Sequence, residues 1–444
     1  MPDKSTPRDD DRSNHNINKP GGVPLGWTTV EDDHRKIGFV TQCTPRMEAE
    51  LLWHTGDGHL LTVAPTGMGK GRSAVIPALL EYPGPIMCID LKGENYQVTA
   101  RRRRRLGHRV VAIDPFKITV QEPDTLNPFD LLSLPGSEAD CDSELLSELL
   151  CGGLPSFSRE MFWDNSGKGL ITGLIGLSAE DEDPAKRTIG QLLDYLYADD
   201  VDYGIAVKLD THKFANTLSR QELCAYLQHE ADRCRPSVRS TAQAMLKCLG
   251  SRSVRTALSK TSFDLNGWLR GDPIDVYLIF PPDKLDSHRA LLRLLFGTFM
   301  AVLLRRPHIP EHRTLLLLDE CAQLGTLGQL RTALTLLRGY GVKAWTFWQD
   351  LSQLKHLYPA DWETVLNNSA VIQVFGLANG WVAKAAADVL GVPASEFLRM
   401  NREDQVLLRP GTEPQMMRRV DYLVDRLFAG KFDANPRYRK PPEM

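Results

Sequence analysis

A glycine-rich stretch, APTGMGKGRS at residues 64–73, carries the residues with the clearest capacity for chemistry. It nearly matches the pattern G-x-x-x-x-G-K-[ST], in which backbone N–H groups wrap phosphate oxygens and a lysine neutralises the outer phosphates. Lys70 stands at the lysine position. Two positions depart from the pattern, because Ala64 replaces the first glycine and Gly71 replaces the hydroxyl residue that ligates Mg²⁺. The stretch is therefore a variant nucleotide site, a degraded one, or a chance arrangement of glycines.

The surroundings of this loop favour a nucleotide site. An apolar run, HLLTVAP at 59–65, predicts a strand before the loop, and GRSAVIPALLEY at 71–82 predicts a helix after it. Phosphate binds readily at a helix N-terminus, because the first backbone N–H groups have no partner within the helix. We expect nucleotide contacts from Pro65, Thr66, Gly67, Met68, Gly69, Lys70, Gly71 and Arg72.

A second motif, TLLLLDE at 314–320, is typical of a buried strand that ends in two carboxylates. In a nucleotide hydrolase, Asp319 would hold Mg²⁺ through water, and Glu320 would polarise the attacking water. The alternative is a strand that ends in solvated acids, which is a common arrangement. The upstream glycine loop and the alternation of strands with helices favour the catalytic interpretation.

Two further strands are expected to deliver polar residues to the same edge of a parallel sheet. KAWTFWQD at 343–350 places Gln349 at its carboxyl end, where the side chain can sense the terminal phosphate or orient water. IDLKGE places Asp90, Lys92 and Glu94 after another strand, as charged groups beside the phosphates. The alternatives are a solvated loop glutamine and an ordinary helix N-terminus with a favourable glutamate.

Composition indicates a globular protein of two to three domains, or one large domain with an insertion. The chain has 444 residues, of which 42% are hydrophobic and 25% charged, and a formal net charge of −3. Any contact with nucleic acid therefore has to be local. The eight cysteines include no C-x-x-C pair, which argues against a zinc ribbon and against a secreted disulfide framework. A reduced cytoplasmic setting fits these features.

No stretch of the sequence predicts a membrane span. The most apolar run, LLFGTFMAVLL at 294–304, is far shorter than the ~20 residues that a membrane helix needs, so we expect a buried core helix there. The polar N-terminus lacks the apolar segment of a signal peptide and predicts a disordered tail over residues 1–28.

The order of the patterns predicts an α/β fold with a mainly parallel sheet, interrupted by an all-α insertion. Strands and helices alternate first, helical patterns then fill the middle of the chain, and strands resume toward a strand–turn–strand near the C-terminus. We therefore divide the chain into the first part of a nucleotide-binding domain (29–136), an inserted all-α domain (137–260) and the second part of the nucleotide-binding domain (261–444).

Eight motifs follow one another in the order found in type IV coupling proteins: APTGMGKGRSAVIPALL, CIDLKGENYQVTA, GHRVVAIDP, LNPFD, FWDNSGKGLITGLI, LLLLDECAQLGTL, WQDLSQLKHLYPADWETVLNNSAVIQVFG and FAGKFDANP. Over roughly residues 35–440, the chain resembles this family of ATPases of conjugation and type IV secretion. The resemblance implies a RecA-like P-loop nucleotide-binding domain with an inserted all-α domain. It also implies ATP and Mg²⁺ as cofactors, and a ring, expected to be a hexamer, with nucleotide between subunits.

The resemblance also bears on single residues. With a glycine after the lysine, this loop resembles that of one branch of the family. Without a hydroxyl at this position, Mg²⁺ would rely on phosphate oxygens, water and Asp319. Arg338, in LLRGYG, occupies the family's position for an arginine that reaches the phosphates of the neighbouring subunit. The alternative for Arg338 is a solvated arginine at a helix end.

Typical members of the family begin with transmembrane helices, whereas this sequence begins with a polar segment. The resemblance therefore implies either a homologue without that region or a truncated chain. The expected location is the cytoplasm, or the periphery of the inner membrane through a secretion complex.

The strongest charge run is RRRRR, from Arg101 to Arg105. Consecutive residues of a helix point all round it, so part of the run has to face water. The run is either a solvated helix with some packed stems, or a contact for DNA phosphates, anionic lipid or acids of a neighbouring subunit.

The sequence supports three functions. The first is an ATP-hydrolysing coupling protein that recruits or moves single- or double-stranded DNA, or nucleoprotein, together with a relaxase or other secretion-system proteins. The second is a platform that recruits protein substrates through the all-α domain and uses ATP binding mainly for assembly. The third is a catalytically weak nucleotide-binding scaffold, as Gly71 suggests.

Overall fold

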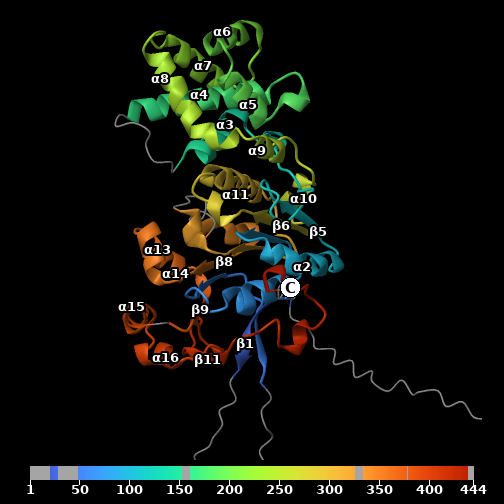
Figure 1. The fold of residues 1–444 in the computed structure, drawn as a ribbon, viewed down its shortest axis with the longest axis vertical. Coiled ribbons are helices and arrows are strands. Elements are labelled where there is room, and N and C mark those ends of the chain that lie inside the picture. Colours follow the sequence, from blue (N-terminus) through green and yellow to red (C-terminus); the bar gives the residue numbers. More distant parts are fainter. Residues whose placement is uncertain (1–20, 29–48, 153–160, 326–333, 378, 439–444) are drawn as a thin grey trace, which may run out of the picture.

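The computed structural model describes residues 21–28, 49–152, 161–325, 334–377 and 379–438. Its centre is a sheet of 11 strands in the order β2-β1-β11-β10-β9-β3-β8-β7-β4-β6-β5 (Figure 1). The strands are β1 (Val23–Thr28), β2 (Leu51–His54), β3 (His59–Val63), β4 (Ile86–Asp90), β5 (Arg109–Ile113), β6 (Ile274–Ile279), β7 (Thr314–Leu318), β8 (Val342–Trp348), β9 (Ser369–Phe375), β10 (Asp404–Leu408) and β11 (Gln415–Arg418).

The sheet has a parallel part and an antiparallel part. The run from β5 to β9 in the sheet order pairs in parallel throughout, and β10, β11, β1 and β2 extend it as antiparallel strands. The central strands β3, β4, β6, β7 and β8 are buried along their whole length. Continuous apolar runs such as TLLLL form such strands, because helices cover both faces of a parallel sheet. The predicted α/β fold with a mainly parallel sheet is confirmed.

The two faces of the sheet bury separate sets of side chains. In β4, Met87 and Ile89 belong to one core, whereas Ile86 and Cys88 belong to the other. This alternation follows from the period of two in a strand. The helices around the sheet are α1 (Ile76–Glu81), α2 (Glu94–Arg105), α11 (Arg289–Leu303), α13 (Leu351–Leu357), α14 (Trp362–Asn367), α15 (Gly380–Leu390) and α16 (Ala394–Arg399).

The apolar run at 294–304 lies almost entirely within the buried helix α11, as expected. None of the helices in the described residues is long and apolar enough to cross a membrane.

A helical region follows β5 and forms a layer of its own at one end of the molecule (Figure 1). Its helices are α3 (Ala139–Cys151), α4 (Met161–Ala179), α5 (Ile189–Leu196), α6 (Val201–Thr211), α7 (Thr217–Gln228), α8 (Cys234–Leu246) and α9 (Arg252–Ala257). Helix α4 lies at the centre of this layer and packs against α3, α5, α7 and α8. The next helix, α10 (Leu265–Arg270), lies beyond the boundary placed at residue 260 and packs against α11 beside the sheet (Figure 1).

The expected disordered tail over residues 1–28 needs a correction at its end. Residues 1–20 lie outside the described residues, but Val23–Thr28 form strand β1, which pairs with β2 and β11. The polar composition of the whole tail hid the short apolar run VPLGWT. Val23 and Leu25 are buried within the core, so the run is held by packing and by the two neighbouring strands.

Candidate functional site

Four adjacent parallel strands, in the order β3-β8-β7-β4, end at one edge of the sheet, which we call the carboxyl edge. The glycine loop follows β3, Gln349 follows β8, Asp319 follows β7, and Asp90 is the last residue of β4. The register places Leu318 opposite Ile89, so the acids that follow these two residues lie side by side. The fold thus brings together residues that the sequence analysis selected from four separate motifs.

The glycine loop is curled by two residues with left-handed backbone, Gly67 with a φ of 82° and Gly69 with a φ of 79°. Residues with a side chain rarely adopt this conformation, so glycine is required at both positions. Ala64, by contrast, continues the strand, because its N–H donates to the carbonyl of Trp348 at 2.8 Å. The missing first glycine is therefore no defect. A helix begins directly after Lys70 and continues into α1.

Lys70 lies between the two acids that follow β7. Its Nζ is 2.5 Å from Oε1 of Glu320 and 3.0 Å from Oδ1 of Asp319. Burial alone would lower the pKa of Lys70, but Asp319 and Glu320 more than offset it, so the pKa is raised. Lys70 is therefore a charged ammonium group. A bound phosphate would compete with Asp319 and Glu320 for this group.

Glu320 is held on both carboxylate oxygens. Oε1 faces Lys70, and Oε2 accepts a hydrogen bond of 3.1 Å from Nε2 of Gln349. Its backbone is left-handed, with φ 56° and ψ 49°, which a residue with a side chain adopts only at a cost of about 1–2 kcal/mol. Strain of this kind is retained where the surrounding contacts overdetermine it, and it is frequent in active sites.

Asp319 offers oxygen to a divalent cation. Its side chain is 22% exposed, and burial raises its pKa while Lys70 lowers it. Oδ1 accepts no hydrogen bond of good geometry in the described part of the chain, although Lys70 lies 3.0 Å away. A carboxylate oxygen with spare capacity suits Mg²⁺. The described residues contain no group of three or more His, Cys, Asp or Glu side chains that could hold a metal ion.

The three residues of IDLKGE lie in different surroundings. Asp90 is buried and accepts hydrogen bonds from the backbone N–H groups of Lys92 and Tyr96, at 3.3 and 2.9 Å. Burial raises the pKa of Asp90 to about 6. Lys92 is exposed. Glu94 points away from the loop, because it accepts from Asn435 at 3.1 Å and pairs with Arg437 at 3.2 Å.

Arg72 differs from the other loop residues that the sequence analysis selected. Its Nε donates to Oδ1 of Asp421 at 2.6 Å, and its Nη2 pairs with the other oxygen of the same carboxylate. The sequence analysis missed Asp421, and it missed Arg419, whose Nη1 donates to the carbonyl of Met68. Both residues lie in RRVDYL near the C-terminus, where no motif marked them.

Arg338 lies at the opposite edge of the sheet, which we call the amino edge. It belongs to a short 3-10 helix, Leu337–Tyr340, just before β8, and its side chain is 60% exposed. Nη2 pairs with Oδ1 of Asp57 at 2.7 Å. The structure therefore does not bring Arg338 to the glycine loop of its own chain.

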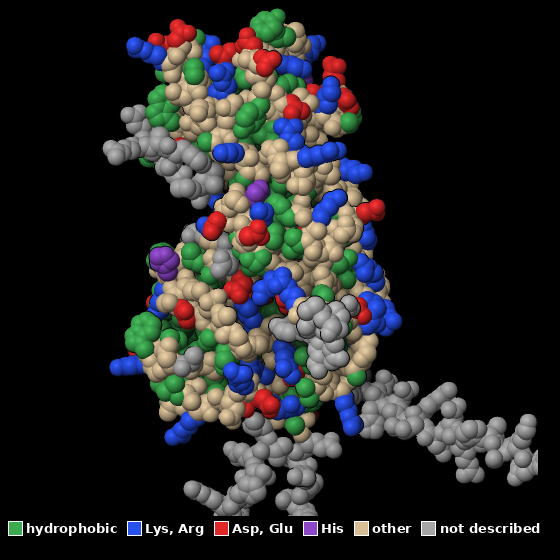
Figure 2. All heavy atoms as spheres, viewed as in Figure 1, with side chains coloured by type: hydrophobic (Ala, Val, Ile, Leu, Met, Phe, Trp, Pro, Cys, Tyr) green, Lys and Arg blue, Asp and Glu red, His purple; other side chains and the backbone are tan. Residues whose placement is uncertain are grey.

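The arginine run at 101–105 is mostly engaged within the chain. Arg103 is fully buried and pairs with the buried Asp275 at 2.6 Å, and Arg101 pairs with Asp433 at 2.6 Å. Arg104 and Arg105 are exposed at the end of α2. Figure 2 shows basic side chains along the margin of the molecule near this helix.

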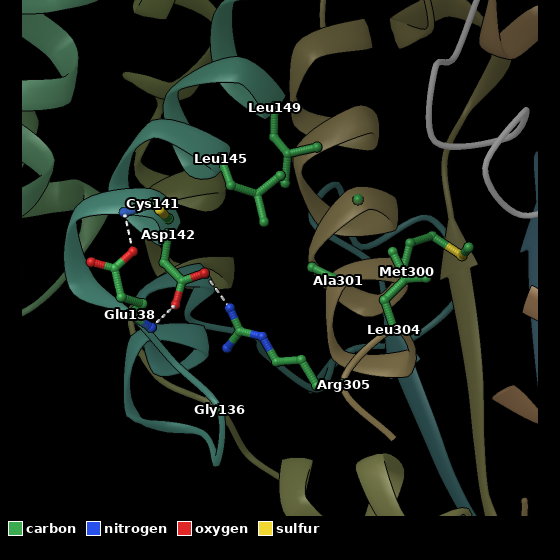
Figure 3. A pocket seen from close by; sticks show the side chains of 11 residues that line it. Gly136, Glu138, Cys141, Asp142, Leu145, Leu149, Met300, Ala301, Leu304 and Arg305 are labelled. Carbon is green, nitrogen blue, oxygen red and sulfur yellow. Dashed lines mark hydrogen bonds and ion pairs between the residues drawn. The ribbon is translucent and has the colours of Figure 1, made fainter. Parts of the chain in front are cut away.

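A cavity of about 510 Å³ lies far from the glycine loop, between α3 and α11. Leu145 and Leu149 face Met300 and Leu304 across it, and Arg305 closes one end through an ion pair with Asp142 (Figure 3). The lining is largely apolar, and its guanidinium group, Arg305, is already paired with Asp142. The cavity therefore belongs to the junction between the helical layer and the sheet, and not to the nucleotide site.

Comparison with known proteins places these observations in a family context. A family profile described as "Type IV secretory system Conjugative DNA transfer" matches residues 28–391. Protein VirD4 of Agrobacterium fabrum (strain C58 / ATCC 33970) is 27% identical over 437 residues, which cover 89% of this chain and 63% of that protein. Conjugal transfer protein TraG of Escherichia coli is 27% identical over 321 residues, which cover 68% of this chain and 50% of that protein. The chain thus spans between half and two thirds of the length of these relatives.

Solved structures share the fold. The plasmid coupling protein TrwB, in complex with the non-hydrolysable ATP analogue ADPNP, superposes with a TM-score of 0.63 at 17% identity, covering 82% of this chain and 85% of that one. VirB4 of Thermoanaerobacter pseudethanolicus gives a TM-score of 0.57 at 13% identity, covering 90% of this chain and 96% of that one. At these identities the likeness shows the fold alone, and it confirms the expected combination of a mainly parallel sheet domain with a helical domain.

Proposed function

The chain belongs to the type IV secretory system conjugative DNA transfer family, and from this premise we propose that it is an ATP-hydrolysing coupling protein. It recruits or moves DNA, or a nucleoprotein, for conjugative transfer or type IV secretion. Its partners in this role are single- or double-stranded DNA and a relaxase or other secretion-system proteins. It acts at the cytoplasmic face of the inner membrane, where a secretion complex holds it.

One observation carries the proposal: Lys70, Glu320 and Gln349 form a connected chain of contacts at the carboxyl edge, with Asp319 beside them. ATP and Mg²⁺ are the proposed cofactors, and solved structures of TrwB with ADPNP and with ADP and Mg²⁺ support this choice. Bound Mg²⁺ would neutralise phosphate charge, held through the Asp319 carboxylate, phosphate oxygens and water.

The residues of the chain then have separate tasks. The phosphates draw the Lys70 ammonium away from Glu320, because a triphosphate offers it more negative charge than one carboxylate does. Glu320, still oriented by Gln349, is then free to accept a proton from the attacking water. Gly67 and Gly69 keep the loop curled around the phosphates.

We further propose a ring in which Arg338 completes the site of the neighbouring subunit. Strand β8 lies between Arg338 and Gln349, and its seven residues span roughly 23 Å at the rise of an extended strand. Arg338 is also largely exposed, so it is accessible to a second subunit. Family resemblance favours six subunits.

A specific feature favours the second candidate function, a platform for protein substrates. Met161 and Phe162 at the start of α4 are 76% and 46% exposed. Phe162 contacts the rings of Trp163 and His229, so an aromatic cluster faces outward on the helical layer. Exposed aromatic groups of this kind are suited to protein contacts.

The decisive experiment measures ATP hydrolysis by the full chain without DNA, with single-stranded DNA and with duplex DNA. We expect DNA to stimulate turnover. Binding of secretion substrates with no stimulation by either DNA would favour the platform. ATP binding without hydrolysis under any condition would favour the weak scaffold.

Glu320→Gln tests the base directly. The amide keeps the size of the side chain but accepts no proton, so hydrolysis should fall by roughly 10²–10⁴-fold while ATP binding remains. Glu182→Gln, at an exposed position of the helical layer, is the matched control. Hydrolysis by Glu320→Gln at the wild-type rate would show that the base is another group.

A further inference from the structure

We propose that Arg419 and Asp421 are positioning residues of the nucleotide site, which hold the glycine loop in place. We call their contacts with the loop, Arg419 with Met68 and Asp421 with Arg72, the brace. This inference rests on the proposed function, because it assigns a role at the same site. Both residues follow β11 and open a C-terminal segment, 419–437, that runs beside α1 and α2. Figure 1 shows this segment next to α2, although the two are more than 300 residues apart in the sequence.

Arg419 is a buried cation whose side chain has one hydrogen-bond acceptor among the described residues. The residue is 6% exposed, its Nη1 donates to the carbonyl of Met68, and its guanidinium lies 4.7 Å from the centre of the Phe375 ring. Its Nε finds no acceptor among the described residues, and burial lowers its pKa. Burying a charge is costly even where Asp404, Asp421 and Glu403 attract it, so packing alone is a poor reason for an arginine here. Its contact with the loop supplies a better one.

The loop needs such a contact at this residue. Met68 stands between Gly67 and Gly69, whose left-handed backbones turn the loop so that its N–H groups can face a phosphate. The carbonyl of Met68 is then left for another donor, and Arg419 provides it. The Met68 side chain lies close against Gly376, where an added Cβ would come within 2.9 Å of its terminal methyl carbon.

Asp421 holds the other end of the loop. Its carboxylate binds Arg72 through two nitrogen–oxygen contacts, an arrangement that fixes orientation as well as distance. The backbone N–H of Tyr422 also donates to the carbonyl of Arg72 at 3.4 Å. Lys70 lies between the two braced residues, so the brace sets the position of the phosphate-binding lysine.

The rest of the segment is anchored elsewhere and offers a matched control. Asp433 pairs with Arg101 of α2 at 2.6 Å, and its N–H donates to the carbonyl of Val98 at 2.9 Å. This ion pair has the same chemistry as Asp421–Arg72 and is likewise partly exposed, but it does not touch the loop. Asp421→Asn and Asp433→Asn are therefore the same change within one segment, and only the first affects the brace.

The test compares nucleotide binding and steady-state hydrolysis in the full chain, with inorganic pyrophosphate, ADP and ATP as ligands. Asp421→Asn and Arg419→Met should each weaken ADP binding and raise KM for ATP by about tenfold, with kcat within about twofold of wild type, because a misplaced loop weakens binding before and during reaction alike. Arg419→Lys should recover part of the loss. The reversed pair, Arg72→Asp with Asp421→Arg, should recover affinity relative to either single change.

Two controls separate the outcomes. Asp433→Asn should bind as wild type does, and thermal unfolding should show that Asp421→Asn stays folded to the same degree as Asp433→Asn. Wild-type protein that binds no nucleotide would overturn the proposed function itself. Wild-type protein that binds nucleotide, alongside Asp421→Asn and Arg419→Met variants of unchanged affinity, would overturn the brace alone.

Discussion

The same three strands, β3, β7 and β8, carry charged residues at both of their ends, and the two edges balance charge in opposite ways. At the carboxyl edge, Lys70 faces two acids and its pKa is raised. At the amino edge, burial and then repulsion by Arg313 lower the pKa of the buried Lys343 to about 8, although Asp57 attracts it. The carboxyl edge pairs its lysine with two acids, and in the proposed function phosphate competes with them, whereas the amino edge holds positive charge in excess.

The histidines of the amino edge show the same imbalance. The pKa values of His54 and His59 are lowered to about 4, chiefly by burial and then by Lys343 and Arg338 respectively. Asp57 is shared, since it pairs with Arg338 at 2.7 Å and with Arg313 at 3.5 Å. Surplus positive charge that the chain does not neutralise is suited to an anion from outside, such as nucleotide held by a neighbouring subunit.

The largest effect is expected at the carboxyl edge. Lys70→Ala should abolish measurable hydrolysis, because it removes the ammonium group that the phosphates need and leaves Asp319 and Glu320 without a cation. ATPase assays and nucleotide binding measure the outcome. Lys208→Ala, in helix α6 of the helical layer, is the control and should behave as wild type. Turnover of Lys70→Ala close to the wild-type rate would mean that the site lies elsewhere.

The next effect sharpens the comparison at the amino edge. Arg338→Ala should bind ATP normally but hydrolyse it roughly 10³-fold more slowly, since charge-stabilising arginines contribute on this scale. Arg270→Ala is the matched control, because Arg270 is also half-exposed and paired with carboxylates.

Mixing subunits tests whether Arg338 acts across an interface. Rings that contain Arg338→Ala and Lys70→Ala subunits should regain some activity, because an intact loop then meets an intact Arg338 of its neighbour. Absence of recovery at every mixing ratio, in rings shown to be mixed, would speak against a shared site.

A stability change is expected from Lys343. Its folded pKa of about 8 lies below the ordinary 10.5, so the unfolded chain binds more protons between these values and stability rises with pH across that window. Below pH 8 the charged form costs the fold roughly 3 kcal/mol. Lys343→Met should therefore raise the free energy of unfolding at pH 7 and remove the rise between pH 8 and 10, as measured by urea unfolding. Lys208→Met serves as control, and an unchanged pH profile for Lys343→Met would refute the charge imbalance.

The smallest effect is expected at Gly71. A Cβ at this position meets no atom within 4 Å, and the backbone is helical, so serine fits without strain. Because Asp319, phosphate and water can complete the shell of Mg²⁺, Gly71→Ser should change the rate by no more than about twofold at any Mg²⁺ concentration. Gly204→Ser, another open helical glycine, is the control. A wild-type protein that is inactive at every Mg²⁺ level and becomes active with Gly71→Ser would identify a degraded loop.

The local parts of the site could be predicted from the sequence. The glycine loop and TLLLLDE each join a strand to the polar residues that follow it. Such short-range patterns can be recognised from the sequence without knowledge of the fold. The helical insertion was predictable for the same reason, since its apolar residues recur at helical spacing. The strand β1 escaped prediction because its six residues lie within a polar segment and are stabilised by pairing with β2 and with β11, almost 390 residues away.

Contacts between side chains that are distant in the sequence were determined only by the tertiary structure. Lys70 and Glu320 are 250 residues apart, and they touch because β3, β8 and β7 are neighbours in a sheet whose order does not follow the sequence. The left-handed backbone of Glu320, the pairing of Arg338 with Asp57, and the contacts of Arg419 and Asp421 with the glycine loop have the same origin. Local propensity shapes a strand, a turn or a helix, but the register between distant strands sets these contacts, because hydrogen bonding and burial across the whole sheet determine it.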